Sequence, residues 1–165
     1  MPRELWLLRH GTAEPGNGKP DEERELNQRG ERESEAAGRA LAELGVEFDL
    51  ALTSPRVRAK RTAELAAKAL GVQPSDHTPL SKDFEADEAR ALLEGQDDGA
   101  RVLLVGHDPD FTQVVLDLTG ARVKLRKGGV AAIRLDGRAG ELLALLAPRE
   151  LDAIAGEPDE RDEQG

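Results

Sequence analysis

The chain has 165 residues, a formal net charge of −10 and no cysteine. This is the length of one domain, and the lack of cysteine excludes disulfides, Cys-ligated zinc, iron–sulfur clusters and thiol catalysis. The negative charge and an aromatic content of 2% argue against nucleic-acid binding, which depends on basic residues and stacking. The first apolar run, Leu5–Leu8, is too short for a signal peptide or a membrane span. We therefore expect a cytoplasmic protein without a nucleic-acid or membrane partner.

The first predicted strand is this unbroken apolar run, which is typical of a strand buried on both faces. It leads directly into Arg9, His10 and Gly11. A charged side chain cannot be buried there without compensation, so the strand should end at Arg9. In open α/β sheets, ligands bind at the carboxyl ends of the strands. The sequence therefore predicts a guanidinium and an imidazole at the ligand-binding edge.

A polar segment without periodicity, Ala13–Glu25, follows the first strand. Loops of this length in compact domains are often lids over functional sites. Asn27 can cap the next helix, whose apolar residues recur at helical spacing as far as Leu44. Gly45 then stands where a C-terminal glycine cap is expected.

The second predicted strand is Phe48–Thr53, followed by Ser54 as a helix N-cap and Pro55 as the first helical residue. That helix should continue to Leu70, and Val72–Ala86 shows no clear pattern.

The last part of the chain repeats the strand–helix alternation. Asp108 and Pro109 repeat the cap-and-proline pattern before a helix, and Asp136-Gly137 is a hairpin signal between the last two strands. The further expected elements are a short helix at 87–94, a strand at 101–107, a helix ending at Gly120, and strands at 130–135 and 141–146.

This alternation predicts a three-layer α/β/α fold with a mostly parallel mixed sheet. We expect residues 1–155 to form a single domain. Residues 156–165 are acidic and lack large apolar side chains, which predicts a disordered tail.

Three strand ends carry groups that suit an anion. The first carries Arg9 and His10, the second leads into a helix whose first turn holds Arg58, and the third carries His107. Helix N-termini add partial positive charge, and arginine donates two parallel hydrogen bonds to phosphate. Taken alone, each of these residues could be an ordinary surface or satisfied polar group. Together they predict a phosphate-sized positive site.

Other kinds of site fit less well. A P-loop beginning at Gly11 would need a lysine where Asn17 stands. The three histidines lack the i, i+4 spacing of a helical metal pair. We therefore expect no metal and no cofactor.

The same residues resemble the motifs of the histidine phosphatase superfamily, the phosphoglycerate-mutase-like proteins. Arg9-His10-Gly11 is similar to the first motif, the segment 54–64 to the second, and 105–107 to the third. The segment 24–30 and the small size further resemble the SixA-type phosphohistidine phosphatases. The resemblance covers about residues 4–148 and implies a phosphoglycerate-mutase-like fold.

The resemblance implies a role for each site residue. His10 would be the nucleophile that forms a phosphohistidine intermediate, and Arg9, Arg58 and His107 would hold the phosphoryl oxygens. Gly11 would let phosphate approach the backbone, and Thr12 is a further candidate for substrate binding. The activity implied is that of a metal-independent phosphohydrolase.

The substrate depends on whether a general acid is present. Many family members use a carboxylate to protonate the leaving alkoxide, and here Asp83 and Glu85 are the candidates in the segment 78–88. Without an acid, a phosphohistidine substrate is favoured, because imidazole is a better leaving group than an alkoxide. The expected partner is then a phosphorylated protein, such as a histidine-containing phosphotransfer domain. The alternatives are a phosphatase for small phosphomonoesters or nucleotides, and a phosphate- or phosphoprotein-binding module without turnover.

Overall fold

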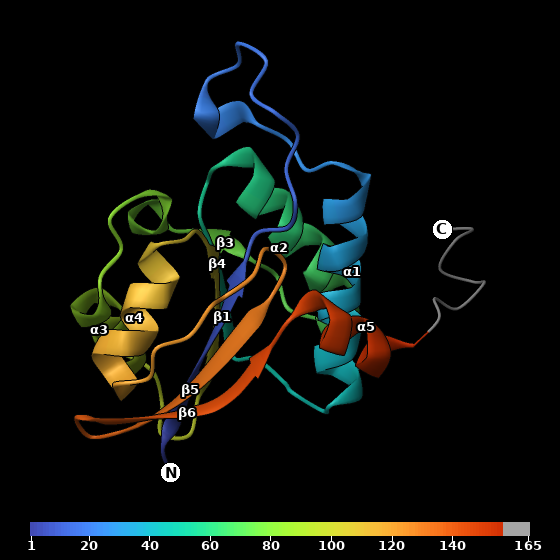
Figure 1. The fold of residues 1–165 in the computed structure, drawn as a ribbon. Coiled ribbons are helices and arrows are strands. Elements are labelled where there is room, and N and C mark those ends of the chain that lie inside the picture. The colour runs from blue at the N-terminus through green and yellow to red at the C-terminus, as the bar shows by residue number, and fades with distance from the viewer. Residues whose placement is uncertain (157–165) are drawn as a thin grey trace.

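A computed structural model describes residues 1–156 of the chain, which form one mixed sheet with helices on both faces (Figure 1). The strands are β1 (Arg3–Arg9), β2 (Leu50–Thr53), β3 (Ser75–Asp76), β4 (Arg101–Gly106), β5 (Val130–Asp136) and β6 (Ala139–Leu146). The helices are α1 (Gln28–Glu43), α2 (Val57–Leu70), α3 (Ala86–Glu94), α4 (Asp110–Thr119) and α5 (Pro148–Ala155), with 3₁₀ turns η1 (Asp21–Glu23) and η2 (Thr78–Ser81).

The strand order is β3-β2-β4-β1-β5-β6. The pairs β1–β4, β2–β4 and β2–β3 are parallel, whereas β5 is antiparallel to both β1 and β6. Strand β1 therefore lies inside the sheet, as its apolar run requires. The predicted α/β fold with a mostly parallel mixed sheet is confirmed.

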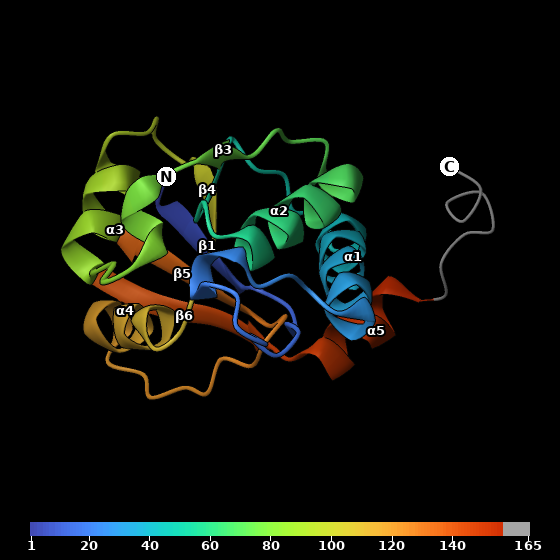
Figure 2. The same cartoon turned by 90° about the horizontal axis from the view of Figure 1, so that it is seen from above.

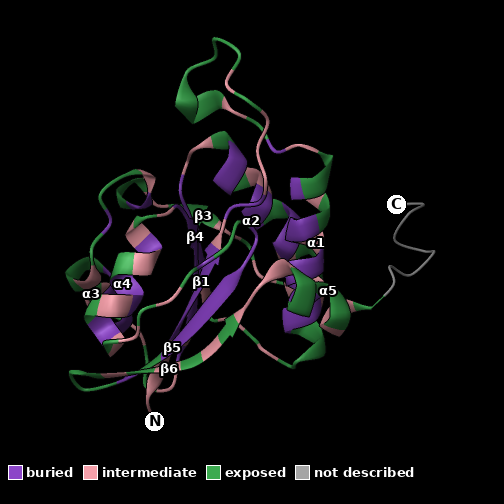
Figure 3. Ribbon diagram, in the orientation of Figure 1, coloured by how far each residue is buried: buried purple, intermediate pink, exposed green. Residues whose placement is uncertain are grey.

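Alternate residues of β1 contact opposite faces of the sheet. Leu5 and Leu7 belong to the core that includes residues of α3 and α4, whereas Trp6 and Leu8 belong to the core with α1, α2 and α5. Figure 2 shows the sheet between these two groups of helices, and Figure 3 shows that the central strands and the inner helix faces are buried. A strand covered on both faces can accept polar residues only at its ends, which places Arg9 and His10 at the edge of the sheet.

Two helices begin later than the sequence predicted. Helix α2 begins at Val57 rather than Pro55, because the Ser54 hydroxyl accepts from the Arg56 amide in a turn before the helix and also contacts His107. Helix α4 begins at Asp110 rather than Pro109. Helix α1 agrees with the prediction, with the Asn27 side chain accepting from the Gly30 amide at 2.8 Å.

Some elements had no signal in the sequence. The segment that lacked a pattern contains the two-residue strand β3 and the turn η2, which are too short to show periodicity. Helix α5 was also not predicted; it packs against α1 through the fully buried Leu151. The predicted tail lies, apart from Gly156, outside the described residues. Within residues 1–156, no helix has both the length and the apolar character needed to cross a bilayer.

Candidate active site

The parallel strands bring the predicted polar groups to one edge of the sheet. Arg9 pairs in register with Gly106, and the Ser54 amide donates to the Val105 carbonyl at 2.9 Å. The residues that follow β1, β2 and β4 are therefore neighbours. The rings of His10 and His107 have centroids 5.3 Å apart, and each residue is only 7% exposed. The structure thus forms the compact centre that the three strand ends predicted.

The hydrogen bonds of His10 define its tautomer. Its Nδ1 lies 2.7 Å from the Gly11 carbonyl oxygen, which can only accept, so Nδ1 carries the hydrogen. The Nε2 lone pair then faces the interior of the site, where the Arg58 Nε lies 3.4 Å away. The Nε2 lone pair of His10 therefore accepts a hydrogen bond from the Arg58 guanidinium.

Burial and neighbouring cations keep both histidines neutral. Burial is the largest cause that lowers the pKa of His10 to about 4; the bond to Gly11 opposes this effect, and the charges of Arg58, Arg9 and Lys127 reinforce it. The pKa of His107 falls to about 3, again mainly through burial, then through repulsion from His10 when that ring is protonated, and through the charge of Arg58. At neutral pH, the His10 lone pair is therefore available to attack an electrophile.

Arg58 is buried at the start of α2 and reaches across to the loop at 13–25. Its Nη1 donates to the Asp21 carbonyl at 2.7 Å, and its Nη2 contacts the Asp21 carboxylate at 3.1 Å. Burial lowers the pKa of Arg58, and the bond with Asp21 raises it in partial compensation. Both terminal nitrogens of Arg58 are thus held by one residue of the loop, while Nε faces His10.

Asp21 also binds two further arginines. Its carboxylate pairs with Arg56 and with Arg24, the latter at 3.1 Å. Burial, the largest single effect, raises the pKa of Asp21, but the bonds to Arg58 and Arg24 outweigh it, and the pKa is lowered overall. The Asp21 carboxylate that contacts Arg58 is an anion, and an anion is what Arg58 was expected to bind. Sequence reasoning missed Asp21, because it lies in the segment without periodicity.

His107 is held by Ser54 at the other side of the centre. Its Nε2 lies 2.7 Å from the Ser54 hydroxyl, and its Nδ1 is buried without a hydrogen-bond partner among residues 1–156. The Nε of Arg9 is likewise buried and unpartnered within that range. Buried polar groups without partners are costly. Two of the three such atoms therefore belong to predicted site residues, as expected for groups that bind an anion.

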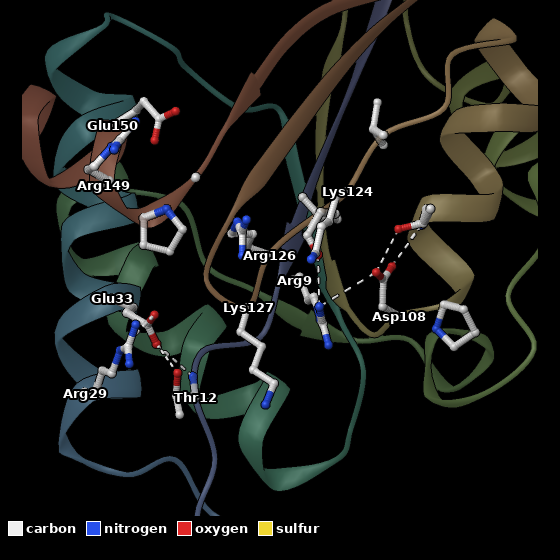
Figure 4. Close-up of a pocket in the computed structure, with 16 residues that line it drawn as sticks. Arg9, Thr12, Arg29, Glu33, Asp108, Lys124, Arg126, Lys127, Arg149 and Glu150 are labelled. Atoms are coloured by element: carbon white, nitrogen blue, oxygen red, sulfur yellow. Dashed lines mark hydrogen bonds and ion pairs between the residues drawn. The ribbon is translucent and has the colours of Figure 1, made fainter.

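Arg9 also lines an open groove (Figure 4). Its Nη1 donates to the Leu125 carbonyl at 2.9 Å and lies 3.8 Å from the Asp108 carboxylate. Thr12 lies beside it in the groove, where both its amide and its hydroxyl donate to Glu33, at 2.9 and 2.7 Å. The two predicted residues are thus tied to their neighbours in the groove.

Packing of the backbone explains why residue 11 is a glycine. A Cβ at this position would lie 2.6 Å from the Gly30 carbonyl oxygen, and one at Gly30 would lie 2.0 Å from the Thr12 carbonyl oxygen. The turn after β1 and the start of α1 therefore touch backbone to backbone. This close approach requires a glycine at position 11, and the role of Gly11 in phosphate binding stays a prediction.

The structure does not bring the two candidate acids into the centre. Glu85 is the N-cap of α3 and shares a capping box with Glu88. Asp83 is exposed, and both residues line a groove between α3 and α4 that contains neither His10 nor Arg58. The carboxylates near the centre are instead Asp21, Asp108 and Glu33, each already engaged with neighbouring donors. Among the described residues, no group of three or more His, Cys, Asp or Glu side chains could hold a metal ion.

The fold and this centre define an α/β protein with buried histidine and arginine side chains gathered at the carboxyl edge of a sheet. The family model of the histidine phosphatase superfamily, branch 1, matches residues 5–81. A protein of Picosynechococcus sp. whose role is uncharacterised is 34% identical over 139 residues, which are 79% of this chain and 84% of that protein. The chain therefore belongs to the histidine phosphatase superfamily, as its motifs predicted.

Two other relatives are informative. A 2,3-bisphosphoglycerate-dependent phosphoglycerate mutase of Sinorhizobium fredii is 42% identical over 74 residues, which are 41% of this chain but only 33% of the mutase. The structure of the protein histidine phosphatase SixA complexed with tungstate matches with a TM-score of 0.82 at 24% identity, over 90% of this chain and 99% of SixA. The predicted phosphoglycerate-mutase-like fold is confirmed by this match, and the prediction of an enzyme of the phosphatase class is confirmed at the level of the family.

Proposed function

We propose that this protein is a phosphohydrolase that works without a metal through a phosphohistidine intermediate on His10, and that its substrate is phosphohistidine on another protein. The observation that carries the proposal is the neutral His10, whose Nε2 lone pair faces Arg58 while Nδ1–H is bound to the Gly11 carbonyl. We assign the whole activity to a single domain, residues 1–155.

In the first step, the His10 Nε2 lone pair forms a bond to phosphorus while the bond to the leaving group breaks in line. Arg9, Arg58 and His107 would bind the phosphoryl oxygens, where charge must be stabilised in the transition state. The fixed cations take the part that a metal plays in other phosphoryl-transfer sites. The buried unpartnered nitrogens of Arg9 and His107 support this assignment.

In the second step, water attacks phosphorus and the bond to Nε2 breaks. His10 leaves as neutral imidazole, because Nδ1 has kept its hydrogen throughout, and the product is dihydrogen phosphate. The bond of 2.7 Å to the Gly11 carbonyl holds the ring in the tautomer that both steps require.

The arrangement of carboxylates supports a phosphohistidine substrate. A phosphohistidine whose second ring nitrogen is protonated releases neutral imidazole and needs no proton from the enzyme, whereas an alkoxide does. Asp83 and Glu85 line a different groove, and the interactions of Asp21 lower its pKa, so it is a poor proton donor. The likeness in fold to SixA, described as a protein histidine phosphatase, agrees with this choice.

A second candidate is a phosphatase for small phosphomonoesters or nucleotides. The similarity to phosphoglycerate mutases over 74 residues favours it, because those enzymes are named for a small phosphate ester. A binding module without turnover is a weaker candidate, since the centre contains a nucleophile as well as an anion site.

A substrate panel tests the proposal. Rates on phosphoramidate, a phosphohistidine peptide and p-nitrophenyl phosphate are measured with and without a chelator. We expect phosphoramidate and the peptide to be hydrolysed fastest, with no effect of the chelator, and a phosphoenzyme stable to alkali but labile to acid. Ester rates equal to the phosphoramidate rate would favour the second candidate, and the absence of any turnover would favour the binding module.

A further inference from the structure

A groove of about 970 Å³ includes Arg9 of the candidate site and is lined by more cations than carboxylates (Figure 4). Six Lys or Arg side chains line it against three Asp or Glu, in a chain whose net charge is −10. Its basic residues are Arg9, Arg29, Lys124, Arg126, Lys127 and Arg149. We call this the cationic groove. Positive charge is thus concentrated beside the site although the protein as a whole is acidic.

The cations of the groove are largely uncompensated. Arg29, Lys124, Arg126, Lys127 and Arg149 are all exposed. Among residues 1–156, no ion pair joins Lys124, Arg126, Lys127 or Arg149 to a carboxylate, and Arg29 has only a contact of 3.8 Å with Glu33. Two of the three acidic side chains also accept hydrogen bonds from threonines: Glu33 accepts from Thr12, and Asp108, which lies 3.8 Å from Arg9, accepts from the amide and hydroxyl of Thr112. Glu150, beside Arg149, is the third.

The segment that carries three of these cations is attached to the catalytic end of β1. The Gly128 amide donates to the carbonyls of His10 and Arg9 at 2.9 and 3.1 Å, and the Arg9 amide donates to the Gly129 carbonyl at 3.1 Å. The Arg9 side chain also donates to the Leu125 carbonyl. Residues 124–127 are therefore held at a fixed place next to the nucleophile, and the charge of Lys127 is close enough to contribute to the lowered pKa of His10.

We infer that the cationic groove is the docking surface for an acidic segment of the phosphorylated partner protein. This segment lies along Arg126, Lys124 and Arg149, while the phosphoryl group of the partner enters the centre at His10. This inference rests on the proposed function and names the chemistry of its partner. Like charges over the rest of the surface would repel an acidic protein that approached elsewhere, so the groove also selects the orientation.

Other occupants fit the groove less well. Its basic residues come from four separate parts of the chain: β1, α1, the 124–127 segment and α5. Its volume is at the upper end of the roughly 300–1,000 Å³ typical of small-molecule pockets. The described residues that line it include no aromatic side chain on which bases could stack. An extended acidic peptide fits the groove better, because its carboxylates can reach cations on separate elements and do not need aromatic side chains to stack on.

Two phosphohistidine peptides test the inference on the full-length protein. They are identical except that the flanking residues are Glu in one and Gln in the other. At low ionic strength, we expect kcat/KM to be roughly tenfold higher for the Glu peptide, and the preference to shrink with added salt. The double variant Lys124→Gln/Arg126→Gln should abolish the preference. Equal rates on the two peptides, or a preference that the variant retains, would overturn the inference.

Arg122→Gln is the matched control, since Arg122 is exposed on the same segment but does not line the groove. It should keep the preference for the Glu peptide. Binding of the unphosphorylated Glu and Gln peptides, followed by fluorescence anisotropy, separates docking from turnover. If nothing is hydrolysed, the proposed function fails, but tighter binding of the Glu peptide that is lost in the double variant still supports the groove.

Two competitors test the other occupants. Tighter binding of a single-stranded oligonucleotide than of the Glu peptide would overturn the choice of a protein partner. Binding of pyrophosphate with no discrimination between the two peptides would assign the groove to a small polyanion and would equally overturn it.

Discussion

The centre formed by His10, Arg58 and His107 lies next to the cationic groove, but the polar groups of the two regions are held in different ways. In the centre, His10, His107 and Arg58 are buried, and each has specific hydrogen-bond partners. In the groove, Arg126 and Lys127 are exposed, and no ion pair within residues 1–156 engages them. Burial is the main cause that lowers the pKa of both histidines, and it fixes the geometry that a chemical step requires. Exposed cations are screened by salt and keep their mobility, which suits recognition of a variable partner.

The largest effect should come from the nucleophile. We expect His10→Ala to reduce kcat by on the order of 10⁴-fold or more and to abolish the phosphoenzyme, because the variant lacks the nitrogen to which the phosphoryl group would be transferred. Rapid quench with labelled phosphoramidate measures both. The double variant Lys124→Gln/Arg126→Gln should still form the phosphoenzyme. Retained turnover in purified His10→Ala would contradict the assignment of His10 as nucleophile. The contrast between a reactive centre and a recognition groove would then have no basis.

The burial of the histidines should also appear in stability. Because the pKa of His10 is about 4 in the folded protein and 6.5 in a free chain, the unfolded state binds the proton first as pH falls. The stability from this group is therefore complete above about pH 6.5 and is lost as pH falls towards 4. We expect the loss due to His10 to reach about 3 kcal/mol. Urea unfolding of the wild type and of His10→Asn at pH 7 and pH 4 measures it. An equal loss in both proteins would show that His10 is not buried as a neutral ring.

Arg58 tests the importance of a fixed geometry. Arg58→Ala should remove about 2 kcal/mol of transition-state stabilisation for each charge-assisted hydrogen bond that is lost, which is at least roughly a thirtyfold fall in kcat/KM. Arg58→Lys keeps the charge but lacks the planar fork, and it should recover only a small part of the activity. Full recovery by lysine would mean that the centre, like the groove, works by charge alone. Steady-state kinetics on phosphoramidate gives the answer.

Asp21 should have the smallest effect. Its carboxylate neutralises Arg58 and Arg56, so Asp21→Asn should increase the affinity for inorganic phosphate by roughly threefold, as expected for a partly exposed ion pair. Competitive inhibition by phosphate measures this change. Glu22→Gln, at an exposed neighbouring position on η1, is the control. Weaker inhibition in Asp21→Asn would instead show that Asp21 holds Arg58 in its working position.

The sheet and the centre were predictable because their signals are local. The apolar runs that end at Arg9 and at Gly106 mark buried strands, and parallel strands must end at the same edge. The start of α2 was placed two residues too early, because the Ser54 side chain could serve a helix or a turn and only its contact with His107 decided between them. The strand β3 was missed because two residues carry no periodicity.

The sequence by itself determined the α/β class, the three polar strand ends and the candidate nucleophile, because hydrophobic periodicity and strand-end residues are properties of short segments. Only the tertiary structure decided that Asp21 binds Arg58, that Asp83 and Glu85 line another groove, and that the Gly128 amide, next to Lys127, donates to the His10 carbonyl. These contacts join parts of the chain that are far apart in sequence. They depend on where a loop without periodicity comes to rest, and no local pattern encodes that.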